Sequence, residues 1–144
     1  MDCFLRKHRR PDVTHRRRAD SIVEFALVLP MLLLILFGIL EVGRVLDAWI
    51  VVQNAARQGA RVGTMATNAT AAQAGAQQAA SSYLQSAFGS RSDIDATPAP
   101  IAVVSADAVQ VNVEADVHIY TPFMQTILSA SVPVRGTAIL PRMV

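Results

Sequence analysis

The chain has 144 residues, of which 52% are hydrophobic and 17% are charged, with a formal net charge of +2 and one cysteine, Cys3. This length allows one modest folded domain beside a membrane anchor and excludes a second sizeable domain. With a single cysteine, no disulfide within the chain stabilises that domain.

Positive charge is concentrated at the N-terminus. Residues 1–18 carry seven Lys/Arg and two Asp, a net of +5, whereas residues 19–144 carry six Lys/Arg and nine acids, a net of −3. Basic residues directly before an apolar helix place the N-terminus in the cytoplasm and the bulk of the chain outside. The same charges would suit nucleic acid, but only Phe4 interleaves with them, so we expect no nucleic-acid partner. Residues 1–19 are interpreted as a flexible, basic cytoplasmic leader.

An apolar segment follows this leader. From Phe25 to Leu40, 16 consecutive residues carry no charge. At a rise of about 1.5 Å per residue, this run with its flanks approaches the ~30 Å hydrocarbon core of a bilayer. We predict a single transmembrane helix over residues 20–43, in the cytoplasmic (inner) membrane, with the lipid bilayer as a partner. A buried core helix is the alternative, but a domain of this size is too small to cover such a helix on every side.

One acid, Glu24, lies near the front edge of the apolar segment. A carboxylate at the centre of a membrane helix costs about 2.5–3.5 kcal/mol on insertion scales, and it usually marks a function with a partner group. At the edge the cost is smaller, and an interfacial acid or a first-turn acid facing the helix N-terminus also fits. The residues alone leave both interpretations open.

The helical pattern continues over residues 44–66. Apolar residues recur by threes and fours along one stripe, which comprises Val42, Val45, Trp49, Val52, Ala56 and Ala60. Three charged residues, Glu41, Arg44 and Asp47, alternate in sign at three-residue spacing, which adds a few tenths of a kcal/mol at best. The glycines of Gln58–Gly63 lie within this periodicity and indicate close helix packing instead of a ligand loop.

A second helix, rich in Ala and Gln, is predicted over residues 70–88, with Gly89 as its stop. Its weak apolar stripe comprises Ala72, Ala76, Ala79, Tyr83 and Phe88. The next stretch, residues 89–100, is rich in turn-forming residues and is predicted to be a linker.

Three strands are predicted after the linker, at residues 101–106, 109–120 and 131–140. The middle one alternates strictly between apolar and polar residues, which is typical of a half-buried strand in an antiparallel sheet. Because proline cannot donate to the strand ladder, Pro133 indicates that the last strand lies at a sheet edge or that the proline is among its first residues. The predicted fold class is α+β: a single N-terminal transmembrane helix in a long helix, a second helix, then a small antiparallel sheet of about three strands. Residues 44–144 would form the extracytoplasmic domain.

The sequence contains no HExxH, GxSxG or phosphate-binding glycine motif. We therefore expect no enzymatic activity, no cofactor and no metal. One alternative site consists of Glu114, Asp116 and His118, whose side chains point the same way at steps of about 7 Å along a strand. They suit either a metal site or a solvated strand face, and we expect the solvated face.

Three segments resemble the TadE-like proteins of tight-adherence (Flp-type) pilus systems. They are SIVEFALVLP at 21–30, GILEVGR at 38–44 and AARQGAR at 55–61. The resemblance is specific over residues 19–63, and beyond them only the general outline is similar. It implies a pilin-like long helix and a structural, pseudopilin-like subunit of the pilus assembly and secretion apparatus. Its partners would be other pilin-like subunits and Tad assembly proteins.

The resemblance also implies a maturation step by a prepilin peptidase on the cytoplasmic side. The expected cut leaves a Glu as the fifth residue of the product, which here places it between Ala19 and Asp20. Such substrates usually have Gly before the cut, where this chain has Ala19. The new α-amino group of Asp20 would pair with Glu24 of a neighbouring subunit. The alternatives are an uncleaved single-pass adaptor of the same machine and a membrane-tethered extracytoplasmic binding module.

Overall fold

The computed structural model describes residues 13–96, 99–122, 125–126 and 129–142, with side chains from Ser21 onward. Its elements are helices α1 (Val13–Thr64) and α2 (Ala69–Phe88) and strands β1 (Ile94–Asp95), β2 (Ile101–Val104), β3 (Ala108–His118) and β4 (Ser131–Pro141). The chain divides into two compact units, Met1–Phe37 and Gly38–Val144. The predicted fold class, a long apolar helix and a second helix followed by a small antiparallel sheet, is confirmed.

Helix α1 contains a segment that is long and apolar enough to cross a membrane. Its stretch Ser21–Thr64 includes an 18-residue window with a mean hydropathy of 2.7, none of which is buried, and it is the one candidate membrane span among the described residues. The helix begins at Val13, so residues 13–19 are helical, whereas we expected a flexible leader over residues 1–19, of which residues 1–12 lie outside the described part of the chain. The sequence between Pro11 and Pro30 contains no Gly or Pro, and its Arg and Ala residues favour helix.

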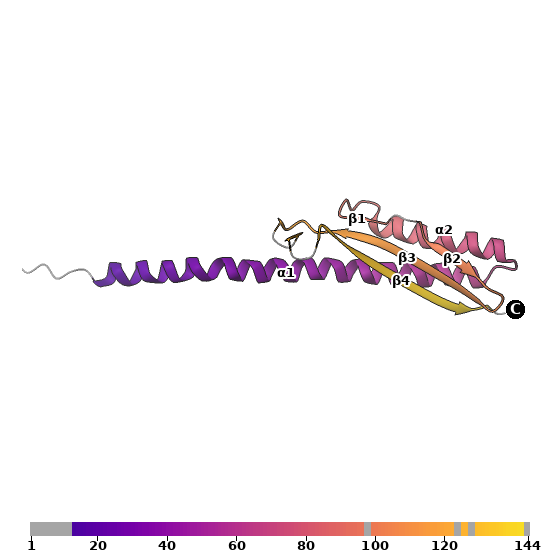
Figure 1. The fold of residues 1–144 in the computed structure, drawn as a ribbon, viewed down its shortest axis with the longest axis horizontal. Helices are drawn as coiled ribbons and strands as arrows, with labels where there is room; N and C mark the ends of the chain where they lie inside the picture. The colour runs from indigo at the N-terminus through magenta and orange to yellow at the C-terminus, as the bar shows by residue number, and fades with distance from the viewer. Residues whose placement is uncertain (1–12, 97–98, 123–124, 127–128, 143–144) are drawn as a thin grey trace, which may run out of the picture. The chain divides into compact units, whose positions relative to one another are not determined.

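Strand β3 is the centre of the sheet. Strand β4 pairs with it antiparallel along its whole length, while β1 and β2 pair with successive parts of its other side (Figure 1). The sheet has four strands instead of the predicted three, because the short strand β1 forms within the predicted linker. β1 and β2 pair with the same side of β3, so the sheet is three strands wide at any point. Pro133 lies in β4, which pairs only with β3 in the described part of the chain. Its predicted position on an edge strand is confirmed.

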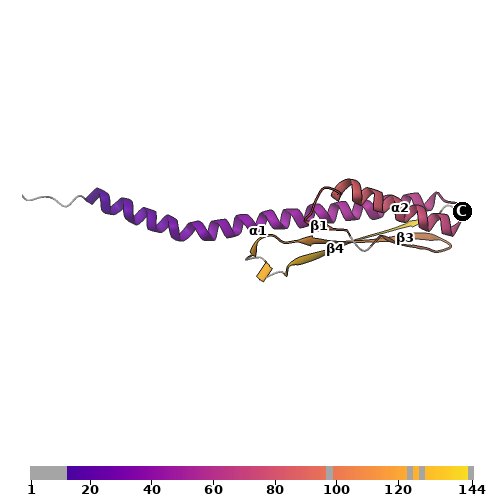
Figure 2. The ribbon, with the colours of Figure 1, turned by 90° about the horizontal axis from the view of Figure 1, so that it is seen from above.

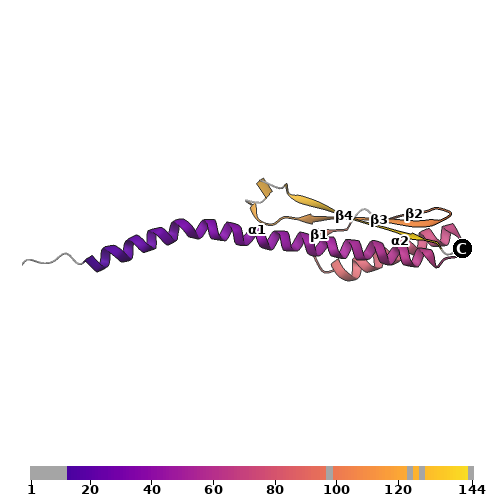
Figure 3. The ribbon, with the colours of Figure 1, turned by 90° about the horizontal axis from the view of Figure 1, so that it is seen from below.

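The core of the Gly38–Val144 unit lies between the sheet and the two helices, which cover the same face of it (Figures 2 and 3). Every second residue of β3 points into this core, and each is at most 2% exposed: Val109, Val111, Val113, Ala115 and Val117. The predicted alternation is confirmed. Burying a valine side chain stabilises a fold by about 1.5–3 kcal/mol, which makes this row the main apolar contribution of the sheet.

Small residues allow α1 to approach its neighbours closely. A Cβ atom on Gly59 would lie 2.8 Å from the carbonyl oxygen of Ala76 in α2. A Cβ atom on Gly136 in β4 would lie 2.8 Å from the carbonyl oxygen of Val52. Neither position has room for a side chain. The packing role predicted for the glycines of Gln58–Gly63 is confirmed.

The predicted apolar stripe of α1 is wrong at two positions. Val42 and Trp49 are 53% and 46% exposed, while Ala48 is fully buried. From the sequence, the larger apolar side chains were predicted to face the core. The helix and the sheet lie close together, however, and only small side chains fit between them.

Helix α2 buries residues at a strict spacing of four: Ala72, Ala76, Ala80, Leu84 and Phe88. Ala80 and Leu84 thus replace Ala79 and Tyr83 of the predicted stripe. The Asn68 side chain caps the helix by accepting a hydrogen bond from the N–H of Ala71 at 2.7 Å. Gly89 is the C-cap, where the stop was predicted.

Candidate functional site

Glu24, the predicted subunit-pairing acid, lies on the exposed surface of the apolar half of α1. It lines a shallow depression together with Val23, Leu27 and Val28. Among the side chains that the structure describes, from Ser21 onward, none forms a hydrogen bond or an ion pair with its carboxylate. The predicted cut between Ala19 and Asp20 falls inside the same helix, about one turn before Glu24.

A second acid of α1, Glu41, is only 6% exposed. Its Oε1 atom accepts hydrogen bonds from the N–H of Tyr120 at 3.2 Å, the N–H of Thr121 at 3.2 Å and the hydroxyl of Thr121 at 2.6 Å. Tyr120 and Thr121 begin the connection between β3 and β4. Glu41 therefore holds this connection against α1, 79 and 80 residues away in sequence.

Arg44 links Glu41 to the chain that follows α2. Its guanidinium forms ion pairs with Glu41 at 2.9 Å and with Asp93 at 2.6 Å. It also donates to the carbonyl of His118 at 3.3 Å and lies 4.9 Å from the centroid of the Tyr120 ring. One cation thus connects α1, the residue before β1 and the end of β3.

Arg91 completes the network from the turn after α2. Its guanidinium pairs with Asp47 of α1 at 2.7 Å and with Asp93 at 3.2 Å. We define the charge cluster as Glu41, Arg44, Asp47, Arg91 and Asp93. The sequence showed the alternating charges on α1, but not their partners, which lie 44 and 49 residues away. The one local signal was an acid directly after the uncharged run.

The pKa of the half-buried Asp93 in the charge cluster lies below its ordinary value. The hydrogen bonds from Arg91, and then those from Arg44, lower the pKa of Asp93 to about 2 against the effect of burial. This pKa lies far from neutrality, where a general acid or base works best.

We expect the stability of the Gly38–Val144 unit to fall when the pH drops below about 4. The pKa of Asp93 is 3.8 before folding and about 2 after it. Its contribution is fully present above the unfolded value and is lost as the pH falls through the folded one, and a shift of this size corresponds to about 2 kcal/mol. Denaturation of the wild type and Asp93→Asn over this pH range checks it. A stability difference between the two proteins that does not shrink in acid would contradict the assignment.

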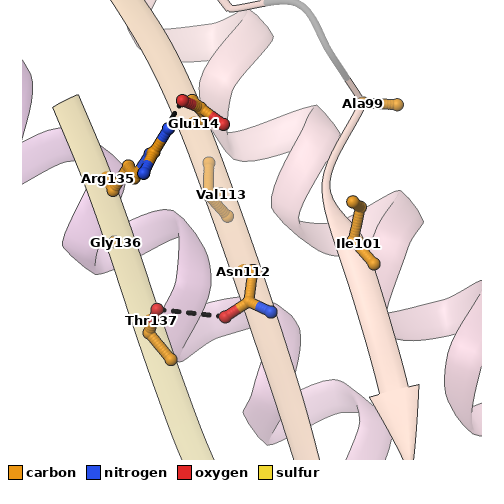
Figure 4. A pocket seen from close by; sticks show the side chains of 8 residues that line it. All are labelled: Ala99, Ile101, Asn112, Val113, Glu114, Arg135, Gly136 and Thr137. Carbon is orange, nitrogen blue, oxygen red and sulfur yellow. Dashed lines mark hydrogen bonds and ion pairs between the residues drawn. The ribbon is translucent and has the colours of Figure 1, made fainter. Parts of the chain in front are cut away.

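The outer face of the sheet carries the alternative site. Arg135 donates to Glu114 at 2.8 Å, and the Thr137 hydroxyl donates to Asn112 at 3.0 Å (Figure 4). These contacts join β4 to β3 beside a shallow pocket of about 170 Å³. Across the residues that the structure describes, no group of three or more His, Cys, Asp or Glu is placed to hold a metal ion. The structure does not bring Glu114, Asp116 and His118 together as a ligand set.

Comparison with known proteins gives one match. A family model described as "TadE-like protein" matches residues 20–61. No curated protein and no solved structure matches the chain. The matched residues include Glu24, the Glu41–Arg44 pair and the small-residue face that packs on α2 and the sheet. The resemblance noted in the sequence is thereby confirmed over residues 20–61, which are similar to TadE-like proteins.

Proposed function

We propose that the chain is a structural, non-enzymatic subunit of a Tad/Flp-type pilus assembly or secretion system, anchored in the membrane and pseudopilin-like. One observation carries this proposal. The apolar window of α1 is wholly unburied, and its single acid, Glu24, has no partner among the side chains described from Ser21 onward. Because an ionisable group in lipid requires a partner, we infer that a neighbouring subunit supplies it.

The surface of α1 from the end of the membrane segment onward, residues 42–50, supports a role in assembly. Four large apolar residues recur there by threes and fours and are 46% to 54% exposed: Val42, Leu46, Trp49 and Ile50. No neighbour lies within 4 Å of a Cβ built on Gly43. A contiguous exposed apolar surface marks contact with protein or membrane.

The proposed orientation has the N-terminus in the cytoplasm and residues 44–144 outside the inner membrane. Its support is the charge asymmetry, +5 over residues 1–18 and −3 over residues 19–144. The basic side of a membrane helix stays in the cytoplasm.

The proposed pairing follows from cleavage between Ala19 and Asp20. Peptide hydrolysis releases residues 1–19 and leaves an α-ammonium group on Asp20, which pairs with Glu24 of a neighbouring subunit. Breaking a desolvated ion pair by removing one partner costs about 3–5 kcal/mol, while the intact pair contributes little net affinity. Glu24 would therefore set the register between subunits.

Glu24→Gln should leave membrane insertion intact and abolish incorporation into the assembly. The amide keeps the size of the side chain but has no charge to pair with the ammonium group. Membrane fractionation and pilus formation in cells that carry only the variant measure the two effects. Glu114→Gln, the same change on the outer face of the sheet, is the matched control. Normal pili with the Glu24 variant would refute the pairing.

A second candidate is an adaptor of the same machine that is never cut. Two observations favour it: Ala19 stands where such substrates usually have Gly, and α1 runs without a break through residues 13–20. Proteases act best on exposed, unstructured segments. The mass of the purified protein separates the candidates, because a product lacking residues 1–19 supports the subunit and the full-length chain supports the adaptor.

A further inference from the structure

Two arginines of α1 take no part in the ion pairs of the described fold. Arg57 and Arg61 are exposed, one turn apart, in the same segment as the tightly packed Gly59. In the parts of the chain with described side chains, no carboxylate forms an ion pair with either of them. Like charges at this spacing repel each other on a helix. Packing accounts for the glycine but not for the arginines.

Arg57 and Arg61 form one wall of a groove. The opposite wall is the end of β4, from Thr137 to Pro141, and the groove has a volume of about 730 Å³. This end of β4 lies beside the last turns of α1 (Figure 1). Met65, which is 69% exposed, adds an apolar surface to the groove.

The β4 side of the groove is a free sheet edge. Among the described strands, β4 pairs only with β3. Its stretch from Val134 to Leu140 has no proline, although Pro133 and Pro141 flank it. The opposite edge of the sheet is interrupted between β1 and β2. Proteins usually block free edges, and an unblocked edge offers main-chain hydrogen bonds to another strand.

We propose that this groove binds an extended segment of a partner protein that carries acidic side chains at alternate positions and adds to β4 as a further strand. Residues four apart on a helix are about 6 Å apart along its axis, and alternate residues of a strand are about 6.8 Å apart. Acidic side chains at positions i and i+2 of an added strand therefore have nearly the same spacing as Arg57 and Arg61 on the helix. Guanidinium–carboxylate pairs are strong and directional, so the arginines select the segment and the strand edge holds its main chain.

A second copy of this chain does not offer such a segment. After the membrane segment, acids at alternate positions occur only in Asp93–Asp95 and Glu114–Asp116. Asp93 is bound by Arg44 and Arg91, and Glu114 and Asp116 lie in the central strand of the sheet. The occupant is therefore a different protein. This inference does not depend on the proposed role in a Tad machine.

Binding of a model peptide to the full chain in zwitterionic nanodiscs tests the proposal. The probe is Thr-Val-Asp-Val-Asp-Val-Thr with a fluorescent label, measured by anisotropy. We expect Arg57→Gln/Arg61→Gln to bind it about tenfold more weakly or worse, and added salt to weaken wild-type binding. Arg135→Gln removes a charge from the outer face of the same strand and should bind like the wild type. N-methylation of the peptide backbone should also abolish binding, because it removes the main-chain donors.

Each single variant, Arg57→Gln and Arg61→Gln, should lose part of the affinity for the peptide. The single variants therefore test the arginines by the same measurement if the double variant is unstable. Equal binding by the double variant and Arg135→Gln would overturn the proposal, as would equal binding of a peptide with Lys in place of Asp. Displacement of the peptide by anionic lipid in the nanodiscs would assign the arginines to headgroups instead. Self-association of the wild type that the double variant lacks would assign the groove to a second copy.

Discussion

Replacing Glu41 with alanine should lower the free energy of unfolding of the Gly38–Val144 unit by about 1–3 kcal/mol. The substitution leaves two N–H groups and the hydroxyl of Thr121 without their acceptor, and it removes one of the two carboxylates that Arg44 pairs with. An unsatisfied buried donor costs its full desolvation penalty. Chemical denaturation of the full chain in detergent micelles, followed by circular dichroism, measures the loss.

Glu114→Ala is the control for this experiment. It removes the same type of side chain from an ion pair with Arg135, but the two side chains are 35% and 75% exposed. Exposed pairs of this kind contribute about 0–1 kcal/mol. Equal losses for the two variants would show that burial of Glu41 does not matter, and the account of the charge cluster would then be wrong.

Gly59→Ala should destabilise the protein by about 1–3 kcal/mol, the usual cost of overpacking. In an open helix the same change stabilises by up to about 1 kcal/mol. Here the new methyl group would lie 2.8 Å from the Ala76 carbonyl oxygen and 3.1 Å from the Ala80 Cβ. The helices must separate to admit it, and the contacts across α1 and α2 would weaken. Thermal denaturation of the variant measures the effect.

The matched substitution is Gly75→Ala in α2. Its new Cβ would have Val62 Cγ1 at 3.4 Å as its nearest neighbour, an ordinary contact. We therefore expect a gain of about 0.5–1 kcal/mol from the lower backbone entropy of the unfolded chain. A gain at both positions would mean that α1 and α2 separate freely and that Gly59 is not needed for their packing.

Features set by local periodicity could be predicted from the sequence. The apolar run of α1, the alternation along β3 and the position of Pro133 each follow from a repeat of side chains within one element. The short strand β1 could not be predicted, because two residues are too few to show an alternation of apolar and polar side chains. Its partners in β3 also lie beyond β2 in the chain, so no local signal indicates the pairing. The buried Ala48 was missed for another reason: close packing selects small side chains, which hydrophobic patterns rank low.

The residues of the candidate sites also differ in how much of their role the sequence alone indicates. Glu24 stood out because a charge in an apolar run is visible locally. Glu41 was visible as a charge, but its burial depends on Thr121 and Arg44 together, and the Thr121 contact lies 80 residues away. Arg57 and Arg61 looked like the polar side of an amphipathic helix. Only the packing of β4 beside α1 turns them into the wall of a groove.

The position of the charge cluster has a mechanical consequence. Glu41 and Arg44 lie just after the start of the Gly38–Val144 unit, so tension carried along α1 enters that unit at these residues. Two contacts pass this tension on to the rest of the unit. Glu41 passes it through its hydrogen bonds with Thr121 to the β3–β4 connection, and Arg44 through its ion pair with Asp93 to the chain before β1. Both contacts tie the start of the unit to segments far along the chain, so pulling on α1 loads them before the apolar core between the helices and the sheet.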